Sequence, residues 1–204
     1  MLINISLVLA SYLLGAIPSG YLITKKIKGF DIRDHGSGNP GAANVYRVVG
    51  KWPGVITFLC DAAKGAAAVL IAKHFAPQQA QDTLAIICGF AAICAHMWTI
   101  FLKLRGGKGV ATSAGVFGAL LPLPTLFALI TFAIVVWRTG RISPGSILAA
   151  VVLPLSSYFF GGHPPSYSIL ATVVGAIVIY RHIPNIKRML NKEELKFEDG
   201  SKKI

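Results

Sequence analysis

The sequence predicts an all-α integral membrane protein with about seven membrane-spanning helices. Hydrophobic residues make up 54% of the 204 residues and charged residues only 14%, which is more apolar surface than a soluble domain of this length can bury. Apolar runs alternate with short polar or basic loops, and 18 of the 20 Lys and Arg residues fall on one side of the resulting map. No soluble domain is left over, so we expect residues 1–204 to form one polytopic domain.

The first three expected spans are separated by one basic loop and one polar loop. They cover residues 2–23, 54–74 and 83–102. Lys25, Lys26 and Lys28 directly follow the first span, which places that end in the cytoplasm and the N-terminus outside. This span lacks a basic leader and is long, so we do not interpret it as a removable signal peptide.

The next apolar stretch, 110–137, contains two prolines that favour a turn. Pro122 and Pro124 divide it into halves at 110–121 and 125–137. Arg138 returns the chain to the basic side only if both halves enter and leave the membrane. Each half would be about 18–20 Å long, which is short for a core of about 30 Å. Two full spans and a re-entrant hairpin therefore both remain open.

Two further spans are expected at 145–160 and 167–180, and the tail from Arg181 onward is expected in the cytoplasm. This map brings the 36–47 loop, the 105–109 loop, the 138–146 connection and the start of the tail to one face of the membrane. Their polar residues are mainly cations and small hydrogen-bond donors. The net charge of +12 is therefore better explained by anionic lipid and cytoplasmic loops than by nucleic acid.

A glycine-rich turn, residues 36–47, is the first candidate for an anion site. Three glycines within six residues expose backbone N–H groups, and Ser37, Asn39 and Asn44 add small polar side chains, with Arg47 close behind. The Gly-x-Gly-x-x-Gly spacing also matches a dinucleotide-binding fingerprint. That motif requires a strand before it and a helix after it, and the surrounding chain is membrane-like, so we reject the interpretation.

The second candidate is the loop from Arg105 to Gly109, where a lysine stands between glycines. This arrangement lets an ammonium and backbone amides meet one phosphate. It is not a Walker A loop, because Gly109 replaces the Ser or Thr that would hold magnesium. These loops contain no nucleophile beside a His–Asp pair and no cluster with metal-ligand spacing, so we expect an anion site without cofactor or metal. The three cysteines lie in apolar runs and are interpreted as small hydrophobic residues.

Four motifs, in order along nearly the whole chain, resemble the bacterial acyl-phosphate:glycerol-3-phosphate acyltransferases, the PlsY family. They are Gly36-Ser-Gly-Asn-Pro-Gly-Ala-Ala-Asn-Val, Asp61-x-x-Lys64-Gly65, His96-Met-Trp followed by Arg105-Gly-Gly-Lys-Gly-Val-Ala111, and Tyr180-Arg-His-x-x-Asn185. The resemblance implies a seven-helix enzyme of the bacterial inner membrane with its active site on the cytoplasmic side.

The implied reaction moves a fatty acyl group from acyl phosphate to the 1-hydroxyl of sn-glycerol 3-phosphate, giving lysophosphatidic acid and phosphate. This is the first acylation of phospholipid synthesis. Its partners would be the two substrates, the lipid bilayer and, functionally, an enzyme that forms acyl phosphate. Acyl phosphate is already activated, so catalysis mainly requires that two anions are held together and that developing charge is stabilised.

The resemblance also implies roles for individual residues. The catalytic set is Ser37, Asn39, Lys108 and His182, and the substrate-binding set is Gly38, Gly41, Asn44, Arg47, Gly106, Gly107, Ser146 and Asn185. Ser143 is a competing alignment for Ser146. We expect the substrate's own phosphate to accept the hydroxyl proton, with His182 as the alternative base.

Three further ionisable residues lie within expected spans. Asp61 and Lys64 are one helical turn apart and are interpreted mainly as a structural pair, with direct substrate contact as the alternative. His96 is interpreted mainly as a packing or hydrogen-bonding residue. A rival function, a membrane transporter of a phosphorylated metabolite, is disfavoured because every site-like loop lies on one side and no inverted repeat is evident.

Overall fold

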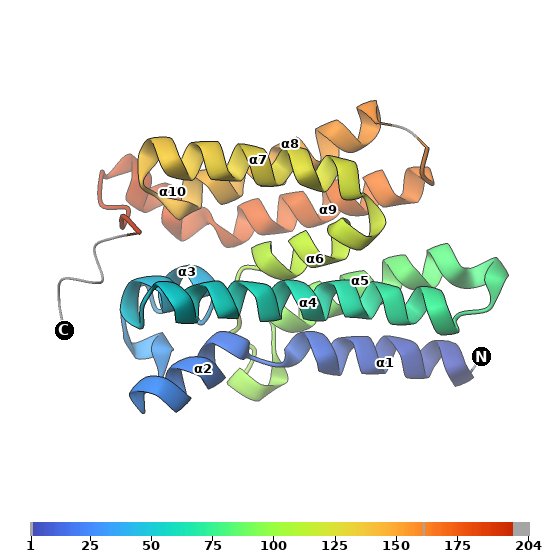
Figure 1. Cartoon of the computed structure of the whole chain (residues 1–204), viewed down its shortest axis with the longest axis horizontal. Helices are drawn as coiled ribbons and strands as arrows, with labels where there is room; N and C mark the ends of the chain where they lie inside the picture. Colours follow the sequence, from blue (N-terminus) through green and yellow to red (C-terminus); the bar gives the residue numbers. More distant parts are fainter. Residues whose placement is uncertain (1, 161, 198–204) are drawn as a thin grey trace.

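The computed structural model describes residues 2–160 and 162–197, and every regular element within them is helical (Figure 1). The longer helices are α1 (Leu2–Ala16), α2 (Ser19–Lys28), α4 (Lys51–Phe75), α5 (Gln81–Met97), α6 (Val110–Leu120), α7 (Pro122–Thr139), α8 (Ile142–Phe159) and α9 (Pro165–Arg181). The shorter ones are α3 (Ala42–Val48), α10 (Ile183–Leu190) and three 3-10 turns, η1 (Ile32–Asp34), η2 (Gln78–Ala80) and η3 (Ile100–Leu102).

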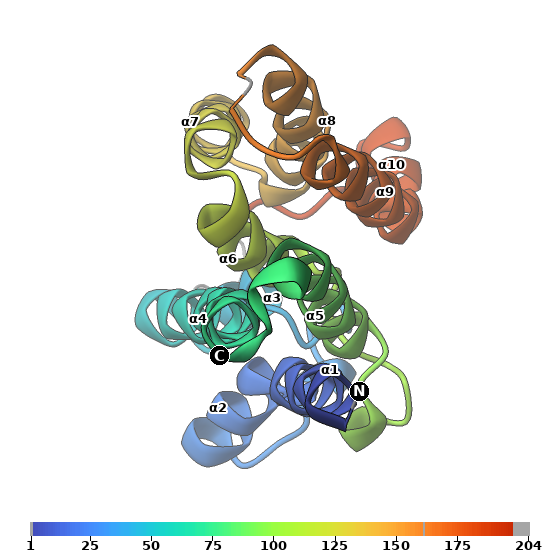
Figure 2. The same cartoon turned by 90° about the vertical axis from the view of Figure 1, so that its right-hand side faces the viewer.

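The long helices form two groups with α6 between them. Helices α1, α4 and α5 pack together, α8 packs against both α7 and α9, and α6 packs mainly on α4. The end-on view shows this division, with α7, α8 and α9 on one side of α6 and α1, α4 and α5 on the other (Figure 2). Phe117 of α6 and Val174 of α9 are buried in the core that joins the groups. The space between the groups is where the site lies.

The outer surface of the bundle is apolar. Leu9, Leu59, Ile134 and Phe159 are all exposed, although each lies in a long helix. Five helical segments are long and apolar enough to cross a membrane, and a sixth is formed if α9 and α10, which meet at 52°, count as one broken span. Exposed apolar side chains around such helices are what a lipid solvent requires. An integral membrane fold is thus confirmed.

The expected first span, 2–23, corresponds to one apolar helical segment, Ile3–Lys28, which contains a break. Helix α1 ends at Ala16, the chain breaks at Ile17 and Pro18, and α2 then continues to Lys28. Pro18 lacks the N–H that an uninterrupted helix needs at this point. At the break, Ala16 O accepts a hydrogen bond from Thr99 Oγ1, and Ile17 O accepts one from Lys64 Nζ.

The turn expected within 110–137 is confirmed at Leu121, but the two halves are unequal. Helix α7 has 18 residues, about 27 Å, whereas α6 has only 11, about 17 Å. The first half is therefore close to the expected length of about 18–20 Å, and the second half is longer than expected. Pro122 occupies the first turn of α7, where its missing N–H costs nothing.

The helices that correspond to the expected spans 54–74, 145–160 and 167–180 begin a few residues earlier, at Lys51, Ile142 and Pro165, because each helix begins before its apolar run.

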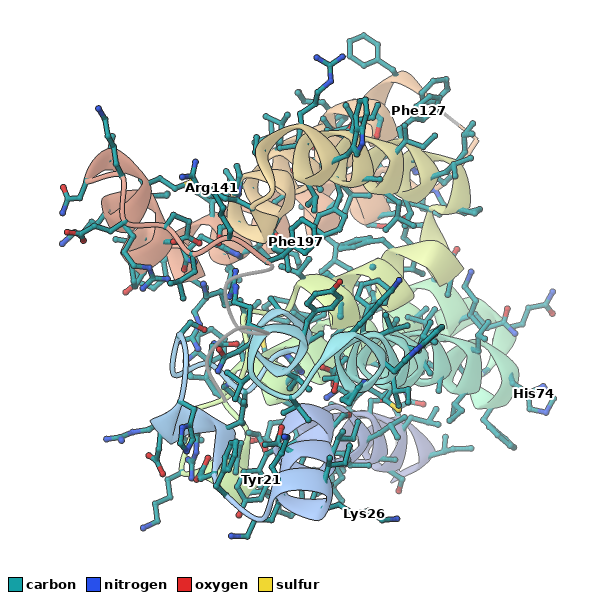
Figure 3. All side chains as sticks on the ribbon, turned by 60° about the vertical axis from the view of Figure 1, so that its left-hand side comes forward. Tyr21, Lys26, His74, Phe127, Arg141 and Phe197 are labelled. Atoms are coloured by element: carbon teal, nitrogen blue, oxygen red, sulfur yellow. The ribbon has the colours of Figure 1, made fainter. Side chains whose placement is uncertain are left out.

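One end of the bundle collects the short elements and the basic loops. Helices α2, α3 and α10 lie toward the left-hand end of Figure 1, and α1 begins at the right. With side chains drawn, Arg141 and Phe197 lie near each other, on the side of the molecule away from His74 (Figure 3). The candidate site opens at this end.

Candidate functional site

A cavity of about 160 Å³ lies between the two helix groups and combines a polar mouth with an apolar wall. Its polar lining comprises Ser37, Asn39, Asn44, Arg47, Asp61, His96, Lys108, Ser143, Ser146, His182 and Asn185. These residues come from the glycine turn, the 105–109 loop, α3, α4, α5, α8, α10 and the junction of α9 with α10, which are far apart in sequence. Most of the residues predicted for the site are thus brought together here, and Gly38, Gly106 and Gly107 are the predicted members outside this lining.

Asn44 holds the glycine turn closed from inside. Its side-chain oxygen accepts a hydrogen bond from Ser37 N at 2.8 Å, and its amide nitrogen donates to His35 O at 2.9 Å. The residue is only 1% exposed. These bonds commit both polar atoms of the Asn44 side chain to the shape of the turn, and substrate binding by Asn44 stays a prediction.

The backbone amides of the turn are also committed internally. Gly41 N donates to Asn39 Oδ1 at 2.9 Å, and Gly38 N donates to His35 O at 3.1 Å. Gly38 has φ of +71°, a conformation that favours glycine. In this structure those amides therefore stabilise the turn itself, and substrate binding by Gly38 and Gly41 stays a prediction. What the turn presents to the cavity is the side chains of Ser37 and Asn39.

The backbone amides of the 105–109 loop, which carries Lys108, are also bonded within the protein. Gly106 N donates to Met97 O and Gly107 N donates to His96 O, each at 3.1 Å, so both amides bind the C-terminal carbonyls of α5. These bonds hold the loop on α5, and substrate binding by Gly106 and Gly107 stays a prediction. The two glycines allow the loop to lie directly on α5, and this contact presents Lys108 to the cavity.

Lys108 begins a chain of polar contacts across the cavity mouth. Its Nζ donates to Asn185 Oδ1, and Asn185 Nδ2 donates to Ser143 Oγ at 2.7 Å and to Glu194 Oε1 at 2.8 Å. Ser143 Oγ donates in turn to Glu194, whose other oxygen accepts from Arg188 Nε at 3.0 Å. Three separate segments, the 105–109 loop, α8 and the tail, are thereby joined around one buried carboxylate.

Sequence reasoning missed Glu194, which is 5% exposed and central to this network. The available signal was an acidic residue in a basic C-terminal tail next to the predicted anion site. The structure also distinguishes the two alternative serines. Ser143 belongs to the network, whereas Ser146 Oγ donates back to Ile142 O at 3.1 Å and lines the cavity one turn further along α8.

Burial and neighbouring charges alter two pKa values in the network. Burial lowers the pKa of Lys108 to about 8, and the positive charges of Arg188 and Arg47 add to the effect against the opposing charge of Glu194. Burial alone would raise the pKa of Glu194, but hydrogen bonds from Ser143 and Asn185 outweigh it, so that pKa is lowered. At neutral pH the mouth thus contains a lysine ammonium and a carboxylate.

Two further predicted residues complete the mouth. Arg47 is 6% exposed, and its guanidinium donates to the carbonyls of Lys196 and Leu195 at 3.2 and 3.4 Å, which ties the tail to α3. His182 follows α9 and lies with Nδ1 2.7 Å from Val178 O. When Nδ1 donates this hydrogen bond, Nε2 carries the lone pair and can accept one.

The inner wall of the cavity is apolar and is built from four helices. Its lining includes Ala111 and Ala114 of α6, Ala128, Leu129 and Phe132 of α7, Ala149, Ala150 and Leu153 of α8, and Val174 and Val178 of α9. Two hydroxyls in this wall, Ser113 Oγ and Thr125 Oγ1, are buried without a hydrogen-bond partner among the described residues. A wall of this kind fits an alkyl chain whose head group lies at the mouth.

The predicted pairing of Asp61 with Lys64 is confirmed, and His96 joins the pair from a neighbouring helix. His96 Nδ1 of α5 is 3.6 Å from Asp61 Oδ1 of α4, and Lys64 Nζ is 2.7 Å from the same oxygen. Asp61 and His96 both line the cavity. Within the residues described, no group of three or more His, Cys, Asp or Glu side chains is arranged to hold a metal ion.

Comparisons with known proteins agree on one family. The family model described as glycerol-3-phosphate acyltransferase matches residues 5–192. A glycerol-3-phosphate acyltransferase of Prochlorococcus marinus (strain MIT 9312) is 44% identical over 97% of this chain and 99% of its own length. One from Syntrophotalea carbinolica is 45% identical over 94% of this chain and 96% of its own length.

Two solved structures are similar throughout. A crystal structure of PlsY, an integral membrane glycerol 3-phosphate acyltransferase, in its glycerol 3-phosphate form has a TM-score of 0.87 and 39% identity, over 95% of this chain and 94% of its own. The lysophosphatidic acid form has a TM-score of 0.85 and 38% identity, over 96% of each chain.

Proposed function

The chain belongs to the glycerol-3-phosphate acyltransferase family, PlsY, and on that premise we propose how its cavity carries out the reaction. The enzyme acylates glycerol 3-phosphate to lysophosphatidic acid. The acyl donor is an acyl phosphate, the acceptor is the sn-1 hydroxyl, and inorganic phosphate leaves. The transporter alternative has lost its support, because the matching relatives are acyltransferases along their whole length.

The observation that carries this proposal is the union of a cationic mouth with an apolar wall in one cavity. Lys108 and Arg47 suit the phosphate groups of two anionic substrates. The wall between α6, α7, α8 and α9 suits the acyl chain of a lipid-like donor. A soluble acceptor and a membrane-embedded donor can therefore meet at the boundary between the two parts.

In the proposed step, the acceptor hydroxyl oxygen attacks the acyl carbonyl carbon and the carbonyl–phosphate C–O bond breaks. The hydroxyl proton passes to a phosphate oxygen, so the products are the ester and hydrogen phosphate. Ser37 and Asn39 hold the acyl phosphate, while Arg47, Lys108 and Asn185 hold glycerol 3-phosphate. His182 positions the acceptor. The protein contributes mainly positioning and stabilisation of the charge on the leaving phosphate.

We place this site on the cytoplasmic side of a bacterial inner membrane. The basic loops and the basic tail lie at the cavity end of the bundle, as the positive-inside rule requires of a cytoplasmic face. In this arrangement the start of α1 lies outside, α9 returns the chain to the cytoplasm, and α6 with α7 enters and leaves together.

The donor assignment is tested with detergent-purified protein and a choice of acyl donors. We expect phosphate release from palmitoyl phosphate that depends on glycerol 3-phosphate and needs no added metal, with 1-palmitoyl lysophosphatidic acid as product. Palmitoyl-CoA should give no product. Product formation from the thioester and not from palmitoyl phosphate would overturn the donor assignment while leaving the acyltransferase intact.

The pKa of Lys108 predicts a fall in activity on the alkaline side. Because its pKa is lowered to about 8, the ammonium that binds phosphate is lost as pH rises through that value. We expect kcat/KM for glycerol 3-phosphate to fall about tenfold per pH unit above about pH 8. Lys108→Arg should move this limb to higher pH, because a guanidinium stays protonated there. An unchanged alkaline limb in that variant would contradict the assignment.

The apolar wall predicts a change in chain-length preference when it is filled. Ala128 is buried and lines the cavity, so Ala128→Phe should displace about four methylenes of a long chain, each worth about 0.8 kcal/mol. We expect kcat/KM to fall about 10²-fold for palmitoyl phosphate and little for octanoyl phosphate. Ala133→Phe, on the exposed side of α7, is the matched control. Equal losses for both donors would exclude this wall as the acyl site.

A further inference from the structure

Three ionisable side chains are buried in helices that cross the membrane and lie outside the assigned substrate contacts. Asp61 is 2% exposed, Lys64 6% and His96 9%. Asp61 Oδ1 is the shared partner, 2.7 Å from Lys64 Nζ and 3.6 Å from His96 Nδ1. Charges in such a position are costly to bury and are retained where they serve function.

Lys64 connects this cluster to the break in the first span. Its Nζ donates at 2.7 Å to Ile17 O, which lies at the break before Pro18 and also accepts a hydrogen bond from Ser19 N at 3.1 Å. Immediately beyond the break, Gly20 lies against the glycine turn, since a Cβ added there would stand 2.1 Å from Pro40 O. Lys64 therefore holds the segment on which the glycine turn rests.

His96 connects the same cluster to the second loop. Its backbone oxygen accepts a hydrogen bond from Gly107 N, and its ring lies against Gly107, where an added Cβ would stand 2.1 Å from Nε2. Lys108 is the next residue. The orientation of the His96 ring, which Asp61 contacts on the other side, therefore decides where the Lys108 loop lies.

We propose that Asp61, Lys64 and His96 are positioning residues that use one intramembrane ionic cluster to hold the glycine turn and the Lys108 loop at a fixed distance from each other. The inference rests on the proposed function, in which Ser37 and Asn39 of the glycine turn hold the donor and Lys108 of the 105–109 loop helps to hold the acceptor. Asp61 is the common point, because it contacts the residue that supports each loop. The cluster thus sets the relative placement of the two substrates.

The decisive variant removes both charges together. A buried ion pair that serves only stability can be replaced by apolar residues at little or no cost. Asp61→Leu/Lys64→Met should therefore stay folded, with an unfolding temperature near that of the wild type. We nevertheless expect KM for glycerol 3-phosphate to rise at least about tenfold and kcat to fall at least about tenfold. A folded variant with both constants within about twofold of wild type would overturn the proposal.

Amide hydrogen exchange provides a readout that does not depend on activity. In the double variant, exchange should increase in both 36–41 and 103–109. Tyr167→Phe is the matched control, because it removes the partly buried hydrogen bond to Asp82 at the opposite end of α5. That control should leave both loops unchanged. Increased exchange confined to α4 and α5 in the double variant would show a local structural role and refute the inference.

His96→Gln keeps the test decisive if the double variant does not fold. His96→Gln removes only the link to the 105–109 loop, so exchange should increase in 103–109 and not in 36–41. Lys64→Arg keeps the positive charge, so exchange in both segments should stay as in the wild type. An unaltered 103–109 segment in His96→Gln would refute the inference on its own. The wild-type protein from the same preparation is assayed with palmitoyl phosphate and with another donor. If the wild type is active with only the other donor, the donor assignment fails. If the wild type is active and the variants show none of the expected changes, this inference fails.

Discussion

Lys108→Ala is expected to lower kcat/KM for glycerol 3-phosphate about 10² to 10³-fold while leaving the protein folded. Lys108 Nζ is the cation that bonds Asn185 in the cavity mouth, and burial strengthens its interaction with a phosphate. Loss of one preorganised donor to a developing charge has an effect of this size in other enzymes. The measurement is phosphate release from palmitoyl phosphate with and without glycerol 3-phosphate.

The matched control for this result is Lys187→Ala. Lys187 is an exposed lysine on α10 at the same end of the molecule, and it does not line the cavity. This variant removes the same charge from the same face, so it should retain activity within about twofold. Similar losses in both variants would mean that the general positive field matters and that Lys108 has no specific role.

Gly106→Ala is expected to lower activity at least about 10²-fold through sterics alone. A Cβ on Gly106 would lie 2.0 Å from His96 O and 2.8 Å from Met97 O, both backbone atoms that cannot rotate away. The loop must then leave α5 and lose the hydrogen bonds of Gly106 and Gly107. Overpacking of this kind costs about 1–3 kcal/mol of stability, and the displacement of Lys108 by even about 1 Å costs about 10²-fold in rate.

Gly118→Ala provides the contrast, because the same substitution meets open space there. Gly118 lies on the exposed face of α6, and an added Cβ finds no atom within 4 Å. Alanine stabilises a helix interior by about 1 kcal/mol relative to glycine. This variant should keep full activity and unfold at an equal or higher temperature. Full activity in Gly106→Ala, measured beside it, would disprove the claim that the loop must lie directly on α5.

Composition and the distribution of charge predict the class of the fold well. A helix that crosses lipid must be apolar along its length, and the loops that end it carry the basic residues on one side. Both signals are local in sequence, so the turn before Pro122 and the basic tail after Arg181 were predictable. Helix ends were not, because residues such as those from Lys51 onward are helical without being apolar.

The candidate site was predictable where a motif places its residues close together. Ser37, Asn39, Lys108, His182 and Asn185 all line one cavity, as the resemblance implied. The sequence could not show that the backbone amides of both loops have partners within the protein, because a glycine-rich pattern indicates only that a loop can bind an anion. Here the partners of those N–H groups are the side chains of Asn39 and Asn44 and the carbonyls at the end of α5.

The sequence alone was enough to establish an integral membrane chain, its basic face and two glycine-rich loops, since each depends on neighbouring residues. Only the tertiary structure decided that Glu194 of the tail lies between Ser143 and Asn185, and that Asp61 is shared by Lys64 and His96. The physical reason is that a buried charge takes its partner from whichever segment the packing brings near. That partner carries no signature in the local sequence.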